Sequence, residues 1–424
     1  MANDTLTLHL EVRQRAKSRI SRAEIQRELD KYLGEQEEVV LDALLYDVVL
    51  PNDVEYVRIC ANSDDKYKVN ILKEKFTKQY HIYQVWEESP QVDSLDEESE
   101  EVPASVNWCL PNVAFEGLWE SLILENGLKE QLMSYVETTL LYSCKKVNAQ
   151  VIHWNGVVLL HGPPGTGKTS LCKALSQKLS IRLNSQYKTS QLIEINTHSL
   201  FSKWFSESAK LVAKMFTSVK QWLQSKDHFV CLLIDEVESL THIRQANGVE
   251  PSDSIRVVNA VLTQIDQLQM YSNVLILATS NVTGTIDVAF ADRADLKLFI
   301  SYPSEWGVYE ILRSCIEELI RCNLVEGDKN DFVEALTYKK LSCTDKNCDE
   351  EVLSEAMKRS EKLMKVAHLC KGLSGRTLRK VPFLTSTKFT NKATPSVARF
   401  LEAMVGVVEQ HKKEQNHFFG QKSS

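Results

Sequence analysis

The sequence predicts an α/β fold in which a parallel sheet, with helices on both faces, carries an α-helical lid and follows a small α+β N-terminal domain. Apolar runs alternate with amphipathic segments from Val157 to Ser301, an order typical of parallel sheets. An acidic segment interrupts the apolar pattern before this region, and a mainly helical pattern follows Pro303. The predicted domains are residues 1–98, 99–303 and 304–424.

The N-terminal domain begins with a strand pattern. The segment Thr5–Val12 alternates apolar and polar side chains, as expected for a half-buried strand. Short strand-like and helical pieces continue to Trp86. The segment Glu87–Glu101 then reads EESPQVDSLDEESEE and has almost no apolar content. Because such a segment cannot bury itself, we predict a mobile, solvated linker there.

Composition limits the classes of partner. With 424 residues, 43% of them hydrophobic, the chain is long enough for two or three domains. Its net charge of -7 provides no general attraction to nucleic acid or to anionic membranes. No apolar run could cross a bilayer, and Met1–Val12 lacks the apolar stretch of a secretion signal. We therefore expect an intracellular, soluble protein with reduced cysteines.

Strand and helix candidates alternate in the central region. A helical pattern over Leu128–Leu141 leads into it. The strand candidates are Val157–Leu160, Leu192–Ile195, Phe229–Ile234, Val274–Ala278 and Leu296–Ile300. The helix candidates between them are Thr169–Leu179, Glu207–Leu223 and Ser254–Leu268. Beyond Pro303, a smaller helical domain is predicted through His411.

A glycine-rich motif stands between the first of these strands and the helix after it. Its glycines would let backbone N–H groups surround phosphates at a helix N-terminus, which is the P-loop pattern. Lys168 is expected to reach the β- and γ-phosphates of ATP, and the Thr169 hydroxyl to bind Mg2+. A turn without a ligand is disfavoured, because a strand precedes the motif and a helix follows it. The residues are Gly162, Pro163, Pro164, Gly165, Thr166, Gly167, Lys168, Thr169 and Ser170.

Two adjacent acids follow a later apolar run. The run Val230–Ile234 delivers Asp235 and Glu236 to the carboxyl end of a buried strand, where open α/β sheets bind ligands. We expect Asp235 to hold Mg2+ together with Thr169, and Glu236 to act as general base for the attacking water. Two solvated acids at a strand end are the alternative, which the preceding P-loop disfavours.

Three later segments resemble parts of AAA+ ATPases. The strand that leads to Asn281 resembles the sensor-one strand, so Asn281 is expected between the γ-phosphate and the water. By resemblance to the second region of homology, Arg293 is an arginine finger for a neighbouring subunit, the alternative being a helix-end ion pair. The segment Gly372–Arg376 resembles a sensor-two helix start, with Arg376 contacting the nucleotide from the lid. The single arginine of the second region and the presence of Arg376 both depart from the main AAA clade.

The segment Ser202–Ser208 resembles the substrate-gripping pore loop of protein-remodelling AAA+ rings. In such loops an aromatic side chain projects into the central channel. Trp204 is the candidate, with Phe205 packing beside it and Lys203 before it. A buried aromatic pair is the alternative, but Lys203 and Ser206 favour an exposed loop.

From about Trp108 through Leu384 the chain resembles the pachytene checkpoint protein 2 family, also called thyroid receptor-interacting protein 13. The resemblance implies a homohexameric ring that uses ATP to unfold part of HORMA-domain proteins, converting closed forms to open ones. It also implies a HORMA-like adaptor, an N-terminal domain that recognises substrate or adaptor, and roles at the meiotic chromosome axis and in the spindle assembly checkpoint. The implied locations are the nucleus, chromosomes, kinetochore and cytoplasm. The segments that carry the resemblance are HGPPGTGKTSLCKAL, LIEINTHSLFSKWFSES, LIDEVESL, SDSIRVVNAVLTQID and GLSGRTLRK.

Two other classes of function are compatible with a P-loop. A clamp loader or helicase would need a basic, salt-sensitive groove, which the acidic balance and the aromatic pair at Trp204 disfavour. A scaffold that binds ATP without hydrolysing it would not need Glu236, Asn281 and Arg293. Neither direct nucleic-acid binding nor membrane binding is predicted.

Overall fold

The computed structural model describes residues 6–61, 68–70, 75–94, 103–148, 150–195, 208–239, 251–281, 288–328, 332, 350–389 and 393–420. The chain divides into two compact units. The first comprises Met1–Leu122, Asn126–His161 and Lys168–Phe299, and the second comprises Ile123–Glu125, Gly162–Gly167 and Ile300–Ser424. Among the helices of the described residues, none is long and apolar enough to span a membrane.

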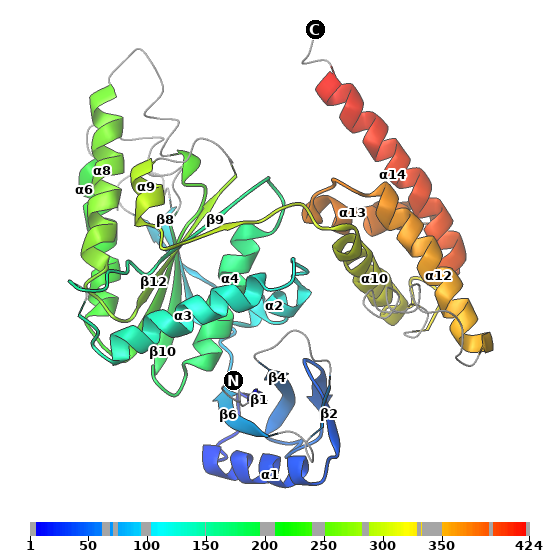
Figure 1. Cartoon of the computed structure of the whole chain (residues 1–424), viewed down its shortest axis with the longest axis horizontal. Coiled ribbons are helices and arrows are strands. Elements are labelled where there is room, and N and C mark those ends of the chain that lie inside the picture. Colours follow the sequence, from blue (N-terminus) through cyan, green and yellow to red (C-terminus); the bar gives the residue numbers. More distant parts are fainter. Residues whose placement is uncertain are drawn as a thin grey trace. The chain divides into compact units, whose positions relative to one another are not determined.

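The N-terminal part is a small sheet with one helix packed on it (Figure 1). Its elements are β1 (Leu6–Gln14), α1 (Arg22–Gly34), β2 (Glu38–Val40), β3 (Leu44–Tyr46), β4 (Val54–Ala61), β5 (Lys68–Asn70) and β6 (Phe76–Tyr83). The sheet order is β3-β4-β1-β6, while β2 pairs with β5. Leu8, Leu10 and Val12 of β1 share one buried core with Ile25 and Leu29 of α1. The alternation predicted for β1 is therefore confirmed on this face.

The opposite face of this sheet is polar and also buried, which corrects the prediction of a half-buried strand. His9 and Glu11 of β1 are only 4% and 1% exposed. Glu11 Oε2 lies 2.8 Å from Lys178 Nζ, and Glu11 Oε1 accepts a hydrogen bond from Arg182 Nε at 2.9 Å. Both cations belong to α4 (Lys168–Arg182), the helix that follows the glycine-rich motif. Ion pairs with a helix distant in sequence thus replace water on this face.

Replacing Glu11 with glutamine is expected to destabilise the protein in a pH-dependent way. Burial opposes ionisation of Glu11, but the charges of Lys178 and Arg182 outweigh it and lower the Glu11 pKa to about 2. A carboxyl with a lowered pKa stabilises the folded chain above its unfolded pKa, and that stabilisation is lost as pH falls through the folded pKa. The melting temperatures of wild type and Glu11→Gln should therefore differ most above about pH 5 and converge as pH falls further.

The expected difference in unfolding free energy is roughly 3 kcal/mol at neutral pH, which follows from the size of the shift in Glu11 pKa. Asp30→Asn is a matched control, because Asp30 pairs with Lys78 at a largely exposed site, where such pairs contribute at most about 1 kcal/mol. If the difference in melting temperature between wild type and Glu11→Gln stayed constant as the pH was lowered, ionised Glu11 would not be the source of the stabilisation.

The central sheet has the order β13-β9-β12-β11-β10-β8-β7, with strands β7 (Gln91–Ser94), β8 (Pro103–Leu110), β9 (Val157–His161), β10 (Thr189–Ile195), β11 (His228–Ile234), β12 (Val274–Ser280) and β13 (Leu296–Phe299). Neighbouring strands from β13 to β10 run parallel. The predicted strands and their parallel arrangement are confirmed. The edge formed by β8 and β7 is antiparallel, which the sequence did not predict.

Part of the predicted acidic linker belongs to this sheet, which corrects the linker prediction. Gln91–Ser94 forms β7 and pairs antiparallel with β8. The prediction depended on the lack of apolar side chains, but an edge strand is held by backbone hydrogen bonds and need not bury its side chains. Val92 accordingly remains 57% exposed. The following residues of the predicted linker, 95–101, lie outside the described part of the chain.

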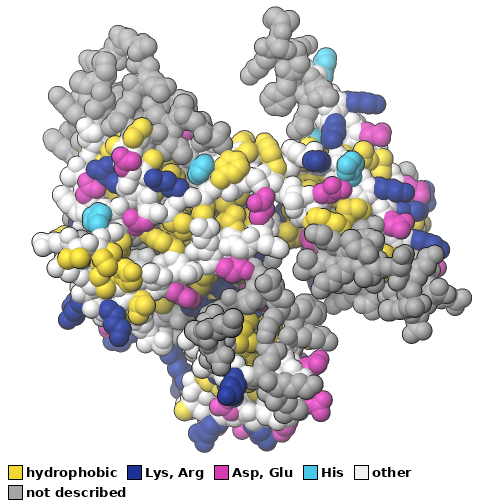
Figure 2. Space-filling model, in the orientation of Figure 1, with side chains coloured by type: hydrophobic (Ala, Val, Ile, Leu, Met, Phe, Trp, Pro, Cys, Tyr) yellow, Lys and Arg dark blue, Asp and Glu magenta, His cyan; other side chains and the backbone are white. Residues whose placement is uncertain are grey.

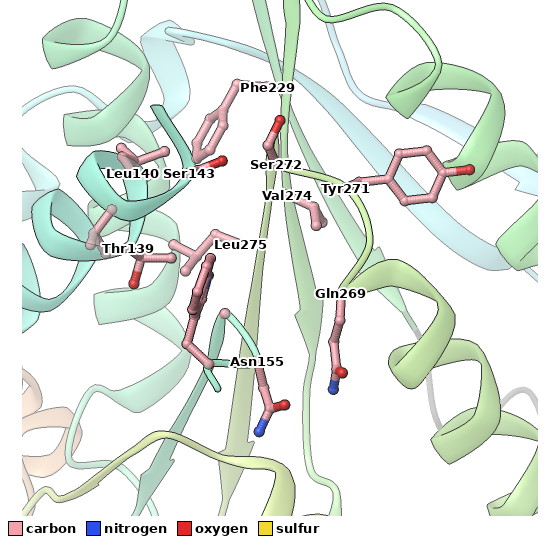
Figure 3. Close-up of a pocket in the computed structure, with 13 residues that line it drawn as sticks. Thr139, Leu140, Ser143, Asn155, Phe229, Gln269, Tyr271, Ser272, Val274 and Leu275 are labelled. Carbon is pink, nitrogen blue, oxygen red and sulfur yellow. The ribbon is translucent and has the colours of Figure 1, made fainter. Parts of the chain in front are cut away.

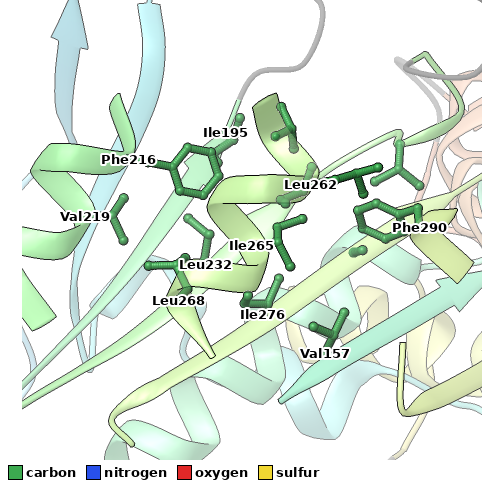
Figure 4. Packing of buried hydrophobic residues seen from close by; sticks show 14 of the residues in the cluster. Val157, Ile195, Phe216, Val219, Leu232, Leu262, Ile265, Leu268, Ile276 and Phe290 are labelled. Carbon is green, nitrogen blue, oxygen red and sulfur yellow. The ribbon is translucent and has the colours of Figure 1, made fainter. Parts of the chain in front are cut away.

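Helices cover the central sheet and build its core (Figure 1). They include α2 (Leu118–Ser121), α3 (Leu128–Cys144), α4, α6 (Ser208–Leu223), α8 (Pro251–Leu268) and α9 (Val288–Arg293). One face of the sheet packs against α6, α8 and α9, where Phe216, Ile265 and Phe290 meet Leu232 and Ile276 of the strands (Figure 4). The helix α4 contacts β10, β11 and β12. The helices predicted over these segments are confirmed.

The second unit is mainly helical, as predicted beyond Pro303. Its described elements are α10 (Glu305–Arg321), α12 (Glu350–Leu369), α13 (Gly375–Ser386), the short η3 (Thr387–Phe389) and α14 (Val397–Gly420). Tyr309 and Leu312 of α10 share a buried core with Leu363, Leu378 and Phe400 from the other three long helices. This helical core is the observed counterpart of the predicted α-helical lid.

Candidate active site

The glycine-rich loop adopts a conformation that requires glycine at three positions. Gly162, Gly165 and Gly167 have φ angles of 146°, 76° and 98°, a region that other residues adopt only with strain. A Cβ on Gly162 would lie 2.2 Å from the carbonyl oxygen of Ile300. The Thr166 hydroxyl closes the turn by donating to Pro163 O at 3.0 Å. The loop therefore has the backbone freedom that a phosphate cradle needs.

Lys168 and Thr169 open α4 directly after this loop. Lys168 is only 4% exposed, so its charge acts in a medium that screens it poorly. Burial and this nearby positive charge lower the pKa of His161, at the end of β9. The carboxyl end of β9 and the first turn of α4 thus form an electropositive region, which suits an anionic ligand.

Thr169 and Asp235 face each other at the carboxyl ends of the strands. The Thr169 hydroxyl lies 2.9 and 3.2 Å from the two Asp235 carboxylate oxygens. The hydroxyl of Thr279, on β12, also donates to Asp235 Oδ1. Oxygen ligands on converging hydroxyl and carboxylate groups are what Mg2+ prefers. The donor set therefore fits the Mg2+ ion that accompanies ATP.

Glu236 is held by contacts between β11 and β12. Its φ angle is 55°, a conformation that is costly for a residue with a side chain and that persists where surrounding contacts hold it. The Glu236 amide donates to the Thr279 hydroxyl at 3.1 Å, and Asn281 Nδ2 donates to Glu236 Oε1 at 3.1 Å. The predicted residues Asp235, Glu236 and Asn281 are therefore brought together with Thr169.

The sequence analysis missed Thr279. Its hydroxyl donates to the Asp235 carboxylate and accepts from the Glu236 backbone amide, so one side chain contacts both residues. A signal was available, because Thr279 stands directly after the predicted strand Val274–Ala278 and two residues before Asn281. Its contact with the acids depends on the pairing of β11 with β12, which motif spacing does not specify.

Arg293 lies near the opposite ends of the strands. It ends α9, and its carbonyl accepts a hydrogen bond at 2.9 Å from Asn155, just before β9 begins. Its guanidinium forms a bidentate ion pair with Asp266 of α8, at 2.6 and 2.8 Å. The five residues of β9 span roughly 16 Å, so Arg293 is remote from Glu236 within one chain.

Arg376 lies in the second unit, beside the glycine-rich loop. The N-cap of α13 is Ser374, and the Arg376 amide donates to Gly165 O at 3.1 Å. A Cβ on Gly165 would meet Ser374 Oγ at 2.8 Å. The start of α13 is therefore packed closely on the loop, while the Arg376 side chain is exposed. The pore-loop candidates Lys203, Trp204 and Phe205 lie outside the described residues.

A separate cavity lies at the amino ends of the strands and is not the nucleotide site (Figure 3). Thr139 of α3, Asn155 before β9, and Tyr271 and Val274 near the start of β12 line it. Its volume of about 30 Å³ suits roughly one or two water molecules. The strands separate this cavity from Asp235.

Three family models match the chain. A TRIP13 N-terminal domain matches residues 3–88, and the ATPase family associated with various cellular activities (AAA) matches residues 158–302. A TRIP13-like, AAA+ ATPase lid C-terminal domain matches residues 304–412. The glycine-rich loop and the paired acids fall within the AAA match.

Individual relatives match nearly the whole chain. The Pachytene checkpoint protein 2 homolog of Homo sapiens is 45% identical over 414 residues, covering 96% of this chain and 94% of that protein. The homolog of Xenopus tropicalis is 49% identical over 344 residues, covering 80% and 77%.

Solved structures share the fold. The structure of C. elegans PCH-2 has a TM-score of 0.76 at 33% identity and covers 96% of this chain and 99% of its own. A chain in the structure of the E. coli MS115-1 HORMA:CdnC:Trip13 complex has a TM-score of 0.50 at 17% identity and covers 76% of this chain and 97% of its own. Because the human relative is similar from one end of the chain to the other, the chain belongs to the pachytene checkpoint protein 2 family and is a nucleotide-binding AAA+ ATPase.

Proposed function

We propose that this chain uses ATP hydrolysis to remodel HORMA-domain proteins, and that it does so as a homohexameric ring. The observation that carries the proposal is the contact of Asn281 with Glu236 beside Thr169 and Asp235, in a chain of this family. A structural neighbour from a complex of HORMA, CdnC and Trip13 supports the choice of substrate. The reaction would convert closed HORMA conformers to open ones.

Each residue of the site would have a defined role in hydrolysis. Lys168 would bind the β- and γ-phosphates, and Thr169 and Asp235 would hold Mg2+. When bound there, Mg2+ would neutralise phosphate charge. Glu236 would accept the proton of the attacking water, and Asn281, which donates to Glu236 Oε1, would orient that carboxylate.

Two arginines would complete the reaction from outside this cluster. Arg293 is remote from Glu236 in its own chain, so we infer that it acts on the γ-phosphate of a neighbouring subunit, where it would neutralise transition-state charge. Arg376 lies in the first turn of α13, and its backbone amide donates a hydrogen bond to Gly165 O of the loop, which supports a contact between its side chain and the nucleotide. Both roles require ATP, and the Arg293 role also requires assembly.

The name of the relatives, pachytene checkpoint protein 2, supports a meiotic setting. We propose action at the meiotic chromosome axis and in the spindle assembly checkpoint, with the protein in the nucleus, on chromosomes and kinetochores, and in the cytoplasm. A HORMA-like adaptor would present the checkpoint substrate, and the N-terminal domain would recognise substrate or adaptor. A pore loop at Lys203, Trp204 and Phe205 would grip the substrate chain.

A nucleic-acid machine is the less favoured reading. On the face shown in Figure 2, the basic side chains of the described residues are interspersed with acidic ones and form no continuous band. A channel that tracks a nucleic acid would be expected to gather positive charge. The net charge of -7 also opposes such binding, so a protein substrate is preferred.

The proposal is tested with the variant Trp204→Ala, in which the rates of substrate remodelling and of ATP hydrolysis are measured separately. If the indole grips the substrate, its contribution is contact area and not an interaction with the phosphates. Trp204→Ala should then keep ATPase activity within about threefold of wild type and abolish the conversion of a closed HORMA protein to its open form. Both rates are measured on the same preparation, together with the melting temperature.

Trp222→Ala is the matched control, because Trp222 of α6 is 38% exposed and has no place in the proposed mechanism. It should leave both activities unchanged. If Trp204 is instead a core residue, its removal would cost about 3 to 5 kcal/mol, and melting temperature, ATPase and remodelling would fall together. Retained remodelling by Trp204→Ala would also contradict the proposal.

A further inference from the structure

Hydrogen bonds link the chain segments that lie beyond the last paired residues of β11 and β12. The parallel register ends at the pair Ile234 and Ala278. Past that point the Val237 amide donates to the carbonyl of Thr279 at 2.9 Å. Further hydrogen bonds between the two segments involve side chains. They include the residues that we assign to catalysis.

Glu238 makes one of these connections. It stands in the turn after β11, three residues beyond Asp235, and is only 8% exposed. Its Oε1 accepts a hydrogen bond from the backbone amide of Asn281 at 3.0 Å. Asn281 in turn donates from Nδ2 to Glu236 Oε1 at 3.1 Å. A buried carboxylate is thus connected to the proposed general base through a single residue.

The two hydrogen bonds hold Asn281 through its backbone N–H and through its side-chain NH2 group. The backbone amide is restrained by Glu238, and the side-chain amide is restrained by Glu236. The bond from the Asn281 amide to Glu238 Oε1 has an ordinary length of 3.0 Å, and Glu238 is buried, so this contact limits where the Asn281 backbone can move. A change in that backbone would change the direction from which Nδ2 approaches Glu236.

We propose that Glu238 is a positioning residue for ATP hydrolysis. It fixes the end of β12 so that Asn281 holds the Glu236 carboxylate in place for the attacking water. The inference depends on the proposed catalytic roles of Glu236 and Asn281. Among the described residues, the hydrogen bond from the Asn281 amide is the contact that Glu238 makes with this site, so its effect is expected to pass through Asn281.

The test compares Glu238→Leu with Glu238→Gln in the full chain. Leucine removes the acceptor, whereas glutamine keeps an oxygen that accepts the Asn281 amide. Glu238→Leu should lower kcat by on the order of tenfold to a hundredfold, because small displacements of catalytic groups have effects of this size. The affinity for a fluorescent ADP analogue and the melting temperature should stay near wild type. Glu238→Gln should retain kcat within about threefold.

A double-mutant cycle with Asn281→Ala decides whether Glu238 acts through Asn281. If it does, Glu238→Leu should lower kcat strongly in the wild-type background and add less than about twofold in the Asn281→Ala background. Equal effects in the two backgrounds would overturn the proposal. The proposal would also be overturned if Glu238→Leu kept the wild-type kcat while Asn281→Ala lowered it. That result would leave the proposed function intact. If Asn281→Ala kept the wild-type kcat, Asn281 would have no catalytic role. The role inferred for Glu238 would then fail as well.

A structural role would give a different result. Glu238→Ala is measured in parallel, because its smaller side chain avoids placing a large apolar group at the site. If kcat, nucleotide affinity and melting temperature fell together in both variants, Glu238 would be a fold residue and the proposal would be wrong. A selective loss of kcat in Glu238→Ala, restored in Glu238→Gln, supports positioning.

Discussion

Replacing Glu236 with glutamine is expected to slow ATP hydrolysis by on the order of a hundredfold or more, the usual contribution of a positioned base. Glutamine has nearly the same shape and keeps an oxygen for the hydrogen bond from Asn281, which spans 3.1 Å in the wild type. It cannot accept the proton of the attacking water. Phosphate release should therefore fall while the affinity for ATP stays near wild type.

The same variant should assemble more stably in ATP, because bound nucleotide persists when hydrolysis is slow. Size-exclusion chromatography with ATP measures this effect. Glu318→Gln is a matched control, since Glu318 is 57% exposed on the lid helix α10 and pairs with Arg321 and Cys322, close to it in sequence. If Glu236→Gln kept wild-type turnover, the general base would have to be another residue.

Replacing Arg293 with alanine is expected to lower turnover by on the order of a thousandfold or more, the effect of removing an arginine finger. ATP binding should be retained, because Arg293 lies at the strand ends opposite to Lys168 and Glu236. Phosphate release and nucleotide affinity are measured separately. The rate of phosphate release should fall while the affinity stays near wild type.

Asp266→Asn distinguishes the arginine finger from an ordinary ion pair. The bidentate contact between Arg293 and Asp266 involves partly exposed groups, 27% and 45% exposed, so it should contribute little to stability. If Arg293 served only this pair, Asp266→Asn would reproduce the loss seen in Arg293→Ala. A finger that acts on a neighbour should instead keep most of its activity in Asp266→Asn.

Mixed rings test whether the action is between subunits. In rings that combine Arg293→Ala with Glu236→Gln subunits, some interfaces pair an intact Glu236 with an intact Arg293. Partial activity should then return, although each variant alone is inactive. Absence of recovery in verified mixed assemblies would indicate that Arg293 acts within its own chain or is structural.

Local sequence patterns were sufficient for the nucleotide-binding fold. The loop from Gly162 to Thr169 needs glycines at positions of positive φ, and this requirement is met within a few residues. The strand β11, which ends at Ile234 just before Asp235, is apolar from Phe229 onward because helices cover both faces of the sheet. Such features depend on neighbours in the chain, so motif and periodicity predict them.

Other predictions failed because the deciding partner is distant in sequence. The segment Gln91–Ser94 was assigned to a solvated linker, yet it pairs with β8 through its backbone, and backbone hydrogen bonding leaves no signature in side-chain polarity. Glu11 was assigned to an exposed strand face, yet it is buried by Lys178 and Arg182.

The sequence by itself determined the family, the parallel α/β core and the residue types of the site, because these reside in short motifs and in periodicity. Only the tertiary structure decided how those residues meet. The pairing of β11 with β12 brings Asn281 to Glu236, and it adds Thr279 and Glu238, to which the sequence analysis assigned no role. The physical reason is that hydrogen bonds between strand ends depend on register and on backbone direction past the ladder, and both are set by the packing of the whole sheet.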